Sequence, residues 1–147
     1  MNNRYFVAEL EPIIREVTES GGEFELYPRG TSMLPLIVEG RDSVMLVKPA
    51  GDIARGDIVL YRRDSGKFVL HRVIRVDGDS FTMCGDNQIT QETGIRREQI
   101  IAVVASLKID GRTVSCESKK YRRFVARWLC IPYRRVMLKL YHMNTKS

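Results

Sequence analysis

The stretch that decides the fold is FVLHRVI at residues 68–74, the most strand-like run in the chain. Its β-branched and aromatic residues favour a strand, in which successive side chains point to opposite faces of a sheet. His71 then shares one face with Val69 and Val73, while Arg72 points to the other. A histidine held in a partly apolar setting is a candidate general base with a pKa near neutrality. The alternative is a structural histidine with satisfied hydrogen bonds.

Further short strands are indicated on both sides of this run. Alternation at Phe24 and Leu26 predicts one strand, and the Asp110-Gly111 pair predicts a two-residue hairpin. The other candidates are residues 43–47, 57–61, 67–76, 80–84 and 99–107. Many short strands with Gly-Asp or Asp-Gly turns predict a compact, mainly β domain with a barrel or sandwich core.

Helical spacing marks both ends of the chain. Apolar residues from Phe6 to Val17 predict an amphipathic helix that packs on the core and ends at Gly21-Gly22. Pro12 either kinks this helix or lies in the first turn of a shorter one. Near the C-terminus, Pro132 separates two apolar stripes, which are Tyr121, Phe124, Val125, Trp128 and Leu129, then Tyr133, Val136, Met137, Leu140 and Tyr141.

Charge divides the chain into two parts. Residues 1–117 hold 15 basic and 18 acidic residues, whereas residues 118–147 hold nine basic and none acidic, so the parts carry −3 and +9. We therefore expect one domain over 1–117 and a basic, amphipathic helical tail over 118–147. Residues 119–141 of this tail suit an anionic membrane surface. The alternative is a tail that packs on the β domain with a solvated basic face. No recognised nucleic-acid motif is visible, so no nucleic-acid partner is expected.

The three cysteines form no CxxC pair, and with two histidines they leave little scope for zinc. We therefore expect neither a metal nor a cofactor. An odd number of cysteines without a secretory signal is typical of free thiols in a reducing compartment. No apolar run approaches the roughly 20 residues of a membrane-spanning helix.

The stretch GTSMLP at residues 30–35 predicts a stiff turn, because Gly30 permits unusual backbone angles and Pro35 fixes its own φ. Ser32 then has a hydroxyl in a defined direction. A serine nucleophile needs a base within about 2.6–3.2 Å and an orienting group behind that base. His71 is the candidate base, and Asp86 and Glu92 are candidate orienters, although each motif alone is also compatible with an ordinary turn or strand.

Four blocks in order resemble the type I signal peptidases: GTSMLP at 30–35, RGDIVLY at 55–61, LHRV at 70–73 and GDN at 85–87. The resemblance covers nearly half of the chain. It implies a β-rich catalytic core with an extended groove in which substrate adds as a strand.

The resemblance also assigns roles to residues. It implies Ser32 as nucleophile and His71 as base, as in the endoplasmic-reticulum, archaeal and sporulation-type members of the family. It places Asp86 at the acidic position needed for activity, with Glu92 where a second aspartate often occurs. Repressor-like, self-cleaving relatives share the fold but use lysine, so they fit less well.

The same resemblance implies substrate contacts close to the nucleophile, with backbone N–H groups near Ser32 meeting the oxyanion. The expected substrate-binding residues are Gly30, Thr31, Met33 and Pro35. Gly30 stands where many bacterial members carry a hydroxyl donor, and Thr31 is the candidate substitute.

The sequence therefore predicts a soluble serine endopeptidase that cleaves an extended leader or signal segment. Only 31 residues precede Ser32 and they contain no apolar anchor, so the usual N-terminal membrane anchor is not expected. The predicted location is the cytoplasm, with the inner face of the membrane as an alternative. The alternative function is a catalytically silent β module that binds extended peptides or an anionic membrane surface.

Overall fold

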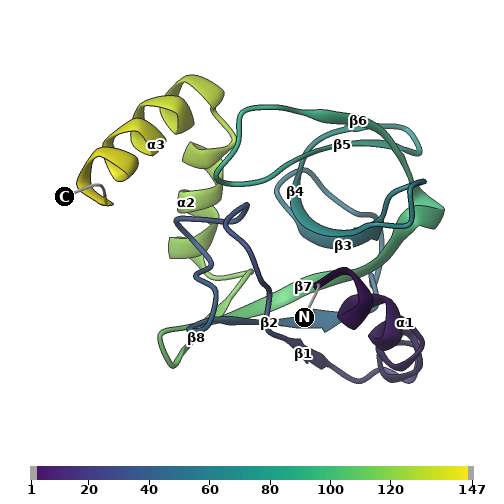
Figure 1. Ribbon diagram of the computed structural model, residues 1–147. Coiled ribbons are helices and arrows are strands. Elements are labelled where there is room, and N and C mark those ends of the chain that lie inside the picture. The colour runs from purple at the N-terminus through teal and green to yellow at the C-terminus, as the bar shows by residue number, and fades with distance from the viewer. Residues whose placement is uncertain (1–2, 146–147) are drawn as a thin grey trace.

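The computed structural model describes residues 3–145, with side chains from residue 9 onward. Phe6 of the predicted N-terminal stripe therefore lies outside the described side chains. The elements are α1 (Asn3–Glu19), β1 (Phe24–Leu26), β2 (Ser43–Val47), β3 (Ile58–Arg62), β4 (Phe68–Asp77), β5 (Ser80–Cys84), β6 (Glu92–Arg96), the 3-10 turn η1 (Arg97–Gln99), β7 (Ile100–Ile109), β8 (Arg112–Ser115), α2 (Lys119–Trp128) and α3 (Ile131–Thr145) (Figure 1).

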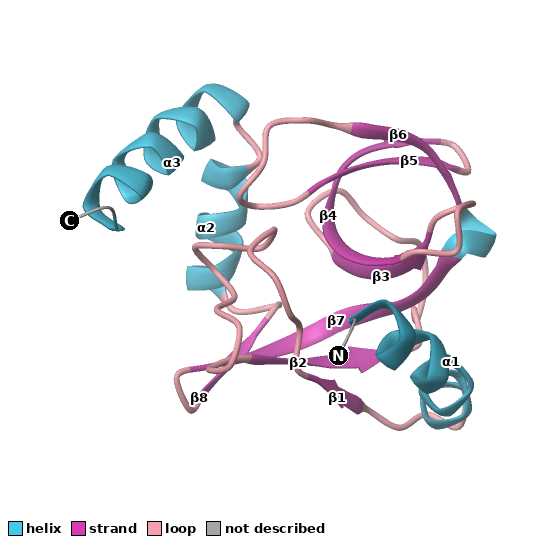
Figure 2. Cartoon of the chain, in the orientation of Figure 1, coloured by secondary structure: helices cyan, strands magenta, loops and turns pink. Residues whose placement is uncertain are grey.

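The strands form one antiparallel sheet in the order β1-β2-β7-β3-β4-β5-β6, and β8 pairs with β7. Figure 2 shows β3 to β6 curling over, with α1 at the lower right beside β1 and β2 and the two C-terminal helices along the left side of the molecule. The mainly β class is confirmed. Among the strands of residues 3–145, β1 and β6 pair with one neighbour each, so the sheet is curved but is not a closed barrel.

Most strands lie where alternation and turn residues predict them. The predicted 43–47 and 80–84 coincide with β2 and β5, and the Asp110-Gly111 pair joins β7 to β8 with Ile109 opposite Arg112. The strand β6 was not predicted, because its sequence ETGIR contains a glycine with positive φ and one buried apolar residue, Ile95. It forms because β5 supplies a partner, with Phe81 opposite Ile95.

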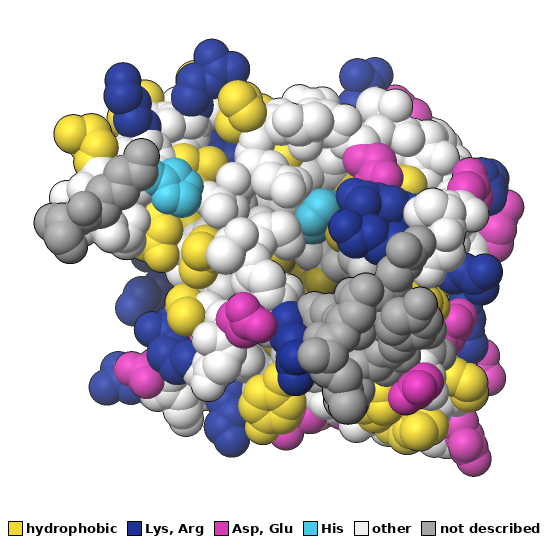
Figure 3. All heavy atoms as spheres, viewed as in Figure 1, with side chains coloured by type: hydrophobic (Ala, Val, Ile, Leu, Met, Phe, Trp, Pro, Cys, Tyr) yellow, Lys and Arg dark blue, Asp and Glu magenta, His cyan; other side chains and the backbone are white. Residues whose placement is uncertain are grey.

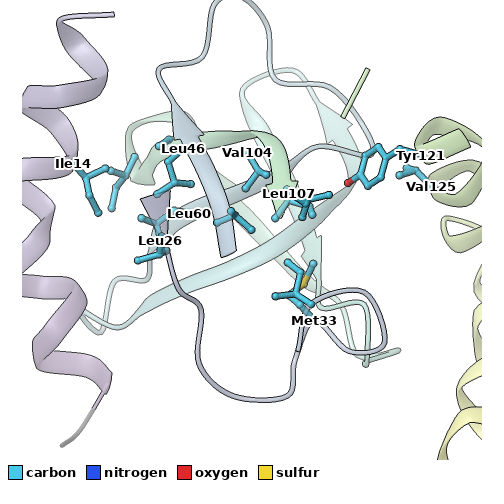
Figure 4. Packing of buried hydrophobic residues seen from close by; sticks show 14 residues of the cluster. Ile14, Leu26, Met33, Leu46, Leu60, Val104, Leu107, Tyr121 and Val125 are labelled. Carbon is cyan, nitrogen blue, oxygen red and sulfur yellow. The ribbon is translucent and has the colours of Figure 1, made fainter. Parts of the chain in front are cut away.

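One hydrophobic core lies between the sheet and the flanking helices. Figure 4 shows Ile14 of α1 at one side of this cluster and Tyr121 and Val125 of α2 at the other. Gly21, with a φ of 88°, ends α1, because its N–H bonds to the carbonyl of Thr18 and the next N–H bonds to that of Val17. Of the predicted N-terminal stripe, Ile14 packs as expected, whereas Ile13 is exposed.

A second core lies on the other face of β3 and β4. Alternation along β3 sends Leu60 into the first core and Val59 and Tyr61 into the second. Val69 and Val73 of β4 join this second core, on the face that they were predicted to share with His71. The sheet thus holds His71 and Tyr61 on one buried face.

The two C-terminal helices pack differently. On α2, Tyr121, Val125 and Trp128 are buried, so its apolar stripe is core packing. On α3, the buried residues are Arg134 and Leu138, and most of the predicted apolar stripe faces outward. Within residues 3–145, no helix has the length and apolarity needed to cross a bilayer.

Candidate peptidase site

The loop that carries Ser32 is anchored by apolar side chains that pack into the core. Met33 and Ile37 are buried in the first core, and the N–H of Leu34 bonds to the carbonyl of Thr31 at 3.2 Å. Gly30 has a φ of 90°, in the region that favours glycine. The predicted stiff turn is therefore present, and it holds Ser32 half-buried between an exposed Thr31 and the buried Met33.

Ser32 and His71 line the same groove, a hollow of about 690 Å³ between the Ser32 loop and the start of β4. Gly30, Thr31 and Met33 also line it, whereas Pro35 is not among its lining residues. Within residues 3–145 the Ser32 hydroxyl makes no hydrogen bond, so the nucleophile and base candidates share a groove without being bonded to each other. Catalytic hydrogen bonds are often long in free enzymes and shorten when substrate binds.

His71 is held by a chain of side chains that ends at Glu92. The Nδ1 atom of His71 lies 3.3 Å from the hydroxyl of Tyr61, and that hydroxyl donates to Oε1 of Glu92. Arg63 donates from Nε to the other carboxylate oxygen of Glu92 at 2.8 Å. The register explains this arrangement, because His71 pairs with Val59 and so lies diagonally across from Tyr61 on the same face.

This chain fixes the tautomer of His71. The single proton of the Tyr61 hydroxyl goes to Glu92, so the tyrosine oxygen accepts from Nδ1–H of His71. The lone pair of the neutral ring is then on Nε2, the other ring nitrogen. Burial and the bond to Glu92 raise the pKa of Tyr61, which keeps that proton on the phenol.

The same surroundings set two further pKa values. Burial lowers the pKa of His71 to about 4, and Arg63 acts in the same direction while Glu92 opposes it. The prediction of a pKa near neutrality was therefore wrong, because His71 is only 5% exposed. Burial opposes ionisation of Glu92, but the hydrogen bonds from Tyr61 and Arg63 hold its pKa below the usual value.

Asp86 lies in a different, fully buried network. Its two carboxylate oxygens accept from Nε and Nη2 of Arg72 at 2.8 and 2.7 Å. His71 and Arg72 are neighbours in β4, so their side chains leave on opposite faces of the sheet. The structure thus brings Glu92, through Tyr61, toward His71 and pairs Asp86 with Arg72. A requirement for Asp86 in activity stays a prediction.

Helices α2 and α3 support the loop that carries Asp86. Trp128 of α2 donates from Nε1 to the carbonyl of Asp86 at 2.9 Å. Arg134 of α3 is fully buried and donates from Nη1 to the carbonyls of Gly85 and Gln88 at 3.3 and 3.2 Å. Its Nη2 lies 3.9 Å from a carboxylate oxygen of Asp86.

The supported loop in turn holds the nucleophile loop. Asn87 donates from its backbone N–H to the carbonyl of Ser32 at 2.9 Å and from Nδ2 to that of Thr31 at 3.0 Å. His142 of α3 bonds from Nε2 to Oδ1 of Asn87 at 2.7 Å. A Cβ on Gly85 would lie 2.6 Å from the carbonyl oxygen of Ser32, so this glycine is needed for the close approach.

Sequence reasoning missed Tyr61, Arg134 and His142. Alternation from Val59 to Tyr61 and from Val69 to His71 was the signal that could have found Tyr61. The two helical contacts had no signal, because they depend on how α3 docks. Within residues 3–145 no group of three or more His, Cys, Asp or Glu side chains is arranged to hold a metal ion, and the cysteines are free thiols.

The mainly β scaffold carries a groove lined by both a serine and a histidine. The chain belongs to the Peptidase S24-like family, whose model matches residues 3–107. Members of this family are serine peptidases or autoproteolytic proteins. The matched range holds all four predicted catalytic residues and excludes α2 and α3. Comparisons with curated proteins and with solved structures gave no match. The signal peptidase branch stays a prediction.

Proposed function

We propose that the protein is a serine endopeptidase in which Ser32 attacks and His71 is the general base. The observation that supports the proposal is the shared groove of Ser32 and His71, in which burial keeps His71 neutral and the hydrogen bonds through Tyr61 to Glu92 fix its tautomer. A buried histidine with a pKa of about 4 is unprotonated in nearly every molecule at pH 7. It is therefore available to accept a proton.

In the proposed reaction, Ser32 Oγ adds to the scissile carbonyl carbon and its proton moves to Nε2 of His71. Backbone N–H groups near Ser32 stabilise the oxyanion. The imidazolium then returns its proton to the leaving amine, the C–N bond breaks, and water hydrolyses the acyl-enzyme by the same steps. Glu92, acting through Tyr61, stabilises the imidazolium, which compensates for the burial of His71.

The lining of the groove supports an extended substrate with acidic side chains. It includes the cationic residues Arg29, Arg63 and Lys67, and no Asp or Glu is among its lining residues. Glu92 pairs with Arg63, which leaves Arg29 and Lys67 to meet substrate. We infer a leader or signal segment as the substrate class from the resemblance to signal peptidases, and an acidic residue close to its cleaved bond from this lining.

Cleavage of a mixed peptide library, read by mass spectrometry, tests the proposal. Ser32→Ala and His71→Ala should each abolish cleavage, and the double variant should be no worse, because the pair acts as one unit. Ser80→Ala, which removes a hydroxyl elsewhere in the sheet, is the matched control. Activity in His71→Ala would contradict the assignment. Arg29→Glu with Lys67→Glu should shift the selected peptides from acidic to basic.

A silent β module is the second candidate, favoured by the lack of a hydrogen bond between Ser32 and His71 within residues 3–145. If this candidate is correct, the intact protein binds and retains library peptides without cleaving any of them. It also predicts equal retention by Ser32→Ala. Cleavage that depends on both residues excludes this candidate.

A further inference from the structure

The outward face of α3 carries an apolar stripe that the other described residues leave largely exposed, and the ring of Tyr133 at its start lies edge-on to Trp128. Tyr133, Val136, Leu140 and Met143 are 37%, 58%, 50% and 63% exposed. Their spacing of three, four and three residues places them on one side of the helix. The buried Arg134 and Leu138 lie on the other side.

This stripe is distinct from the aromatic residues of α2. Trp128 is 3% exposed and its indole N–H bonds to the Asp86 carbonyl, so it has no part in an outer surface. Of the two stripes predicted in the tail, that of α2 is core packing. In the stripe predicted on α3, Tyr133, Val136 and Leu140 are exposed, whereas Met137 and Tyr141 are half-buried. No Asp or Glu occurs after Glu117, so no carboxylate of the tail opposes an anionic partner.

Exposed cations lie on both C-terminal helices. Arg135 and Lys139 lie on α3 itself, and Arg122, Arg123 and Arg127 are exposed on α2. Figure 3 shows dark-blue Lys and Arg side chains beside yellow hydrophobic ones over the α3 region at the upper left. Exposed apolar, aromatic and cationic side chains on one helix are features that helices lying in the plane of a bilayer surface share.

We propose that α3 is a docking surface for an anionic lipid bilayer, with Tyr133, Val136, Leu140 and Met143 entering the interface and Arg135 and Lys139 meeting lipid phosphates. The positive charge of the tail favours an anionic bilayer over a neutral one. The apolar stripe favours a bilayer over nucleic acid, which binds mainly through its phosphate charges. The proposal goes beyond the peptidase function and does not depend on Ser32.

Co-sedimentation of the full chain with vesicles of 7:3 phosphatidylcholine and phosphatidylglycerol tests the proposal, with pure phosphatidylcholine vesicles for comparison. Binding should be strong at low salt on the anionic vesicles, weaker at high salt and undetectable on the neutral ones. Each cation near an anionic bilayer strengthens binding about fivefold, so Arg135→Ala with Lys139→Ala should weaken it roughly 25-fold.

The decisive variant is Val136→Asp with Leu140→Asp, which should abolish binding and leave the fold intact because both side chains are exposed. Its matched control is Ile13→Asp with Val76→Asp, which alters exposed apolar residues elsewhere and should bind like the wild type apart from a small charge effect. Wild-type binding by the Val136→Asp, Leu140→Asp protein would overturn the proposal. The proposal would also be overturned if the intact protein did not bind anionic vesicles. The same holds if sedimentation velocity showed that the intact protein is a dimer and that this variant is a monomer.

Discussion

Acid should destabilise the protein through His71. The pKa of this residue falls from 6.5 to about 4 on folding, because its ring is buried and Arg63 lies near it. Between these two values the unfolded chain binds a proton on the residue that the folded chain does not. The stability contributed by the neutral histidine is therefore complete above pH 6.5 and is lost as the pH falls toward 4. At pH 4 the loss amounts to about 3 kcal/mol of unfolding free energy.

Urea unfolding at pH 7 and pH 4 measures this loss, with fluorescence of the single tryptophan, Trp128, as the probe. The wild type should lose about 3 kcal/mol more than His71→Asn between the two pH values, and His71→Gln should match His71→Asn. An equal loss in all three proteins would refute the reasoning. The same shift predicts that kcat/KM stays constant down to about pH 5 and falls toward pH 4, since kcat/KM reports the free enzyme.

Three further results separate the two acidic residues and test the support of the nucleophile loop. Asp86→Asn should lower the unfolding free energy by about 3–5 kcal/mol, because it leaves buried guanidinium charges unpaired. Glu92→Gln should lower it by under about 1 kcal/mol and reduce kcat roughly tenfold or more. Urea unfolding and a peptidase assay check both variants, and equal stability losses would contradict the assignment. Gly85→Ala should abolish cleavage in a protein that still unfolds cooperatively, because a Cβ would displace the Ser32 carbonyl, and full activity would contradict that contact. Trp128→Ala should cost about 3–5 kcal/mol, and no loss would mean that the C-terminal helices fold apart from the β domain.

The strands were predictable because both the alternation and the turns are local features. The Gly30 turn and the face of His71 follow from the same rules, and both agree with the structure. Whether the sheet closes into a barrel was not predictable, since closure depends on whether the two edge strands pair with each other. Because β6 was not predicted, the position of Glu92, which begins that strand, could not be deduced from the sequence.

The two candidate orienters could have been separated by one further step. Alternation places Arg72 on the face opposite His71, and a buried arginine requires an acidic partner. Asp86, shortly after the strand that pairs with Arg72, is that partner. The role of α3 could not be inferred in this way, because Arg134 reads as one more surface cation until the docking of the helix is known.

Covalent labelling tests the central assignment most directly, because it requires no knowledge of the substrate. Intact protein treated with a peptide phosphonate should gain one adduct, and digestion should place it on Ser32. Ser32→Ala should gain none, and His71→Ala should react far more slowly, since the base activates the hydroxyl. An unlabelled Ser32 in the intact protein, or labelling that proceeds at the same rate without His71, would contradict the account.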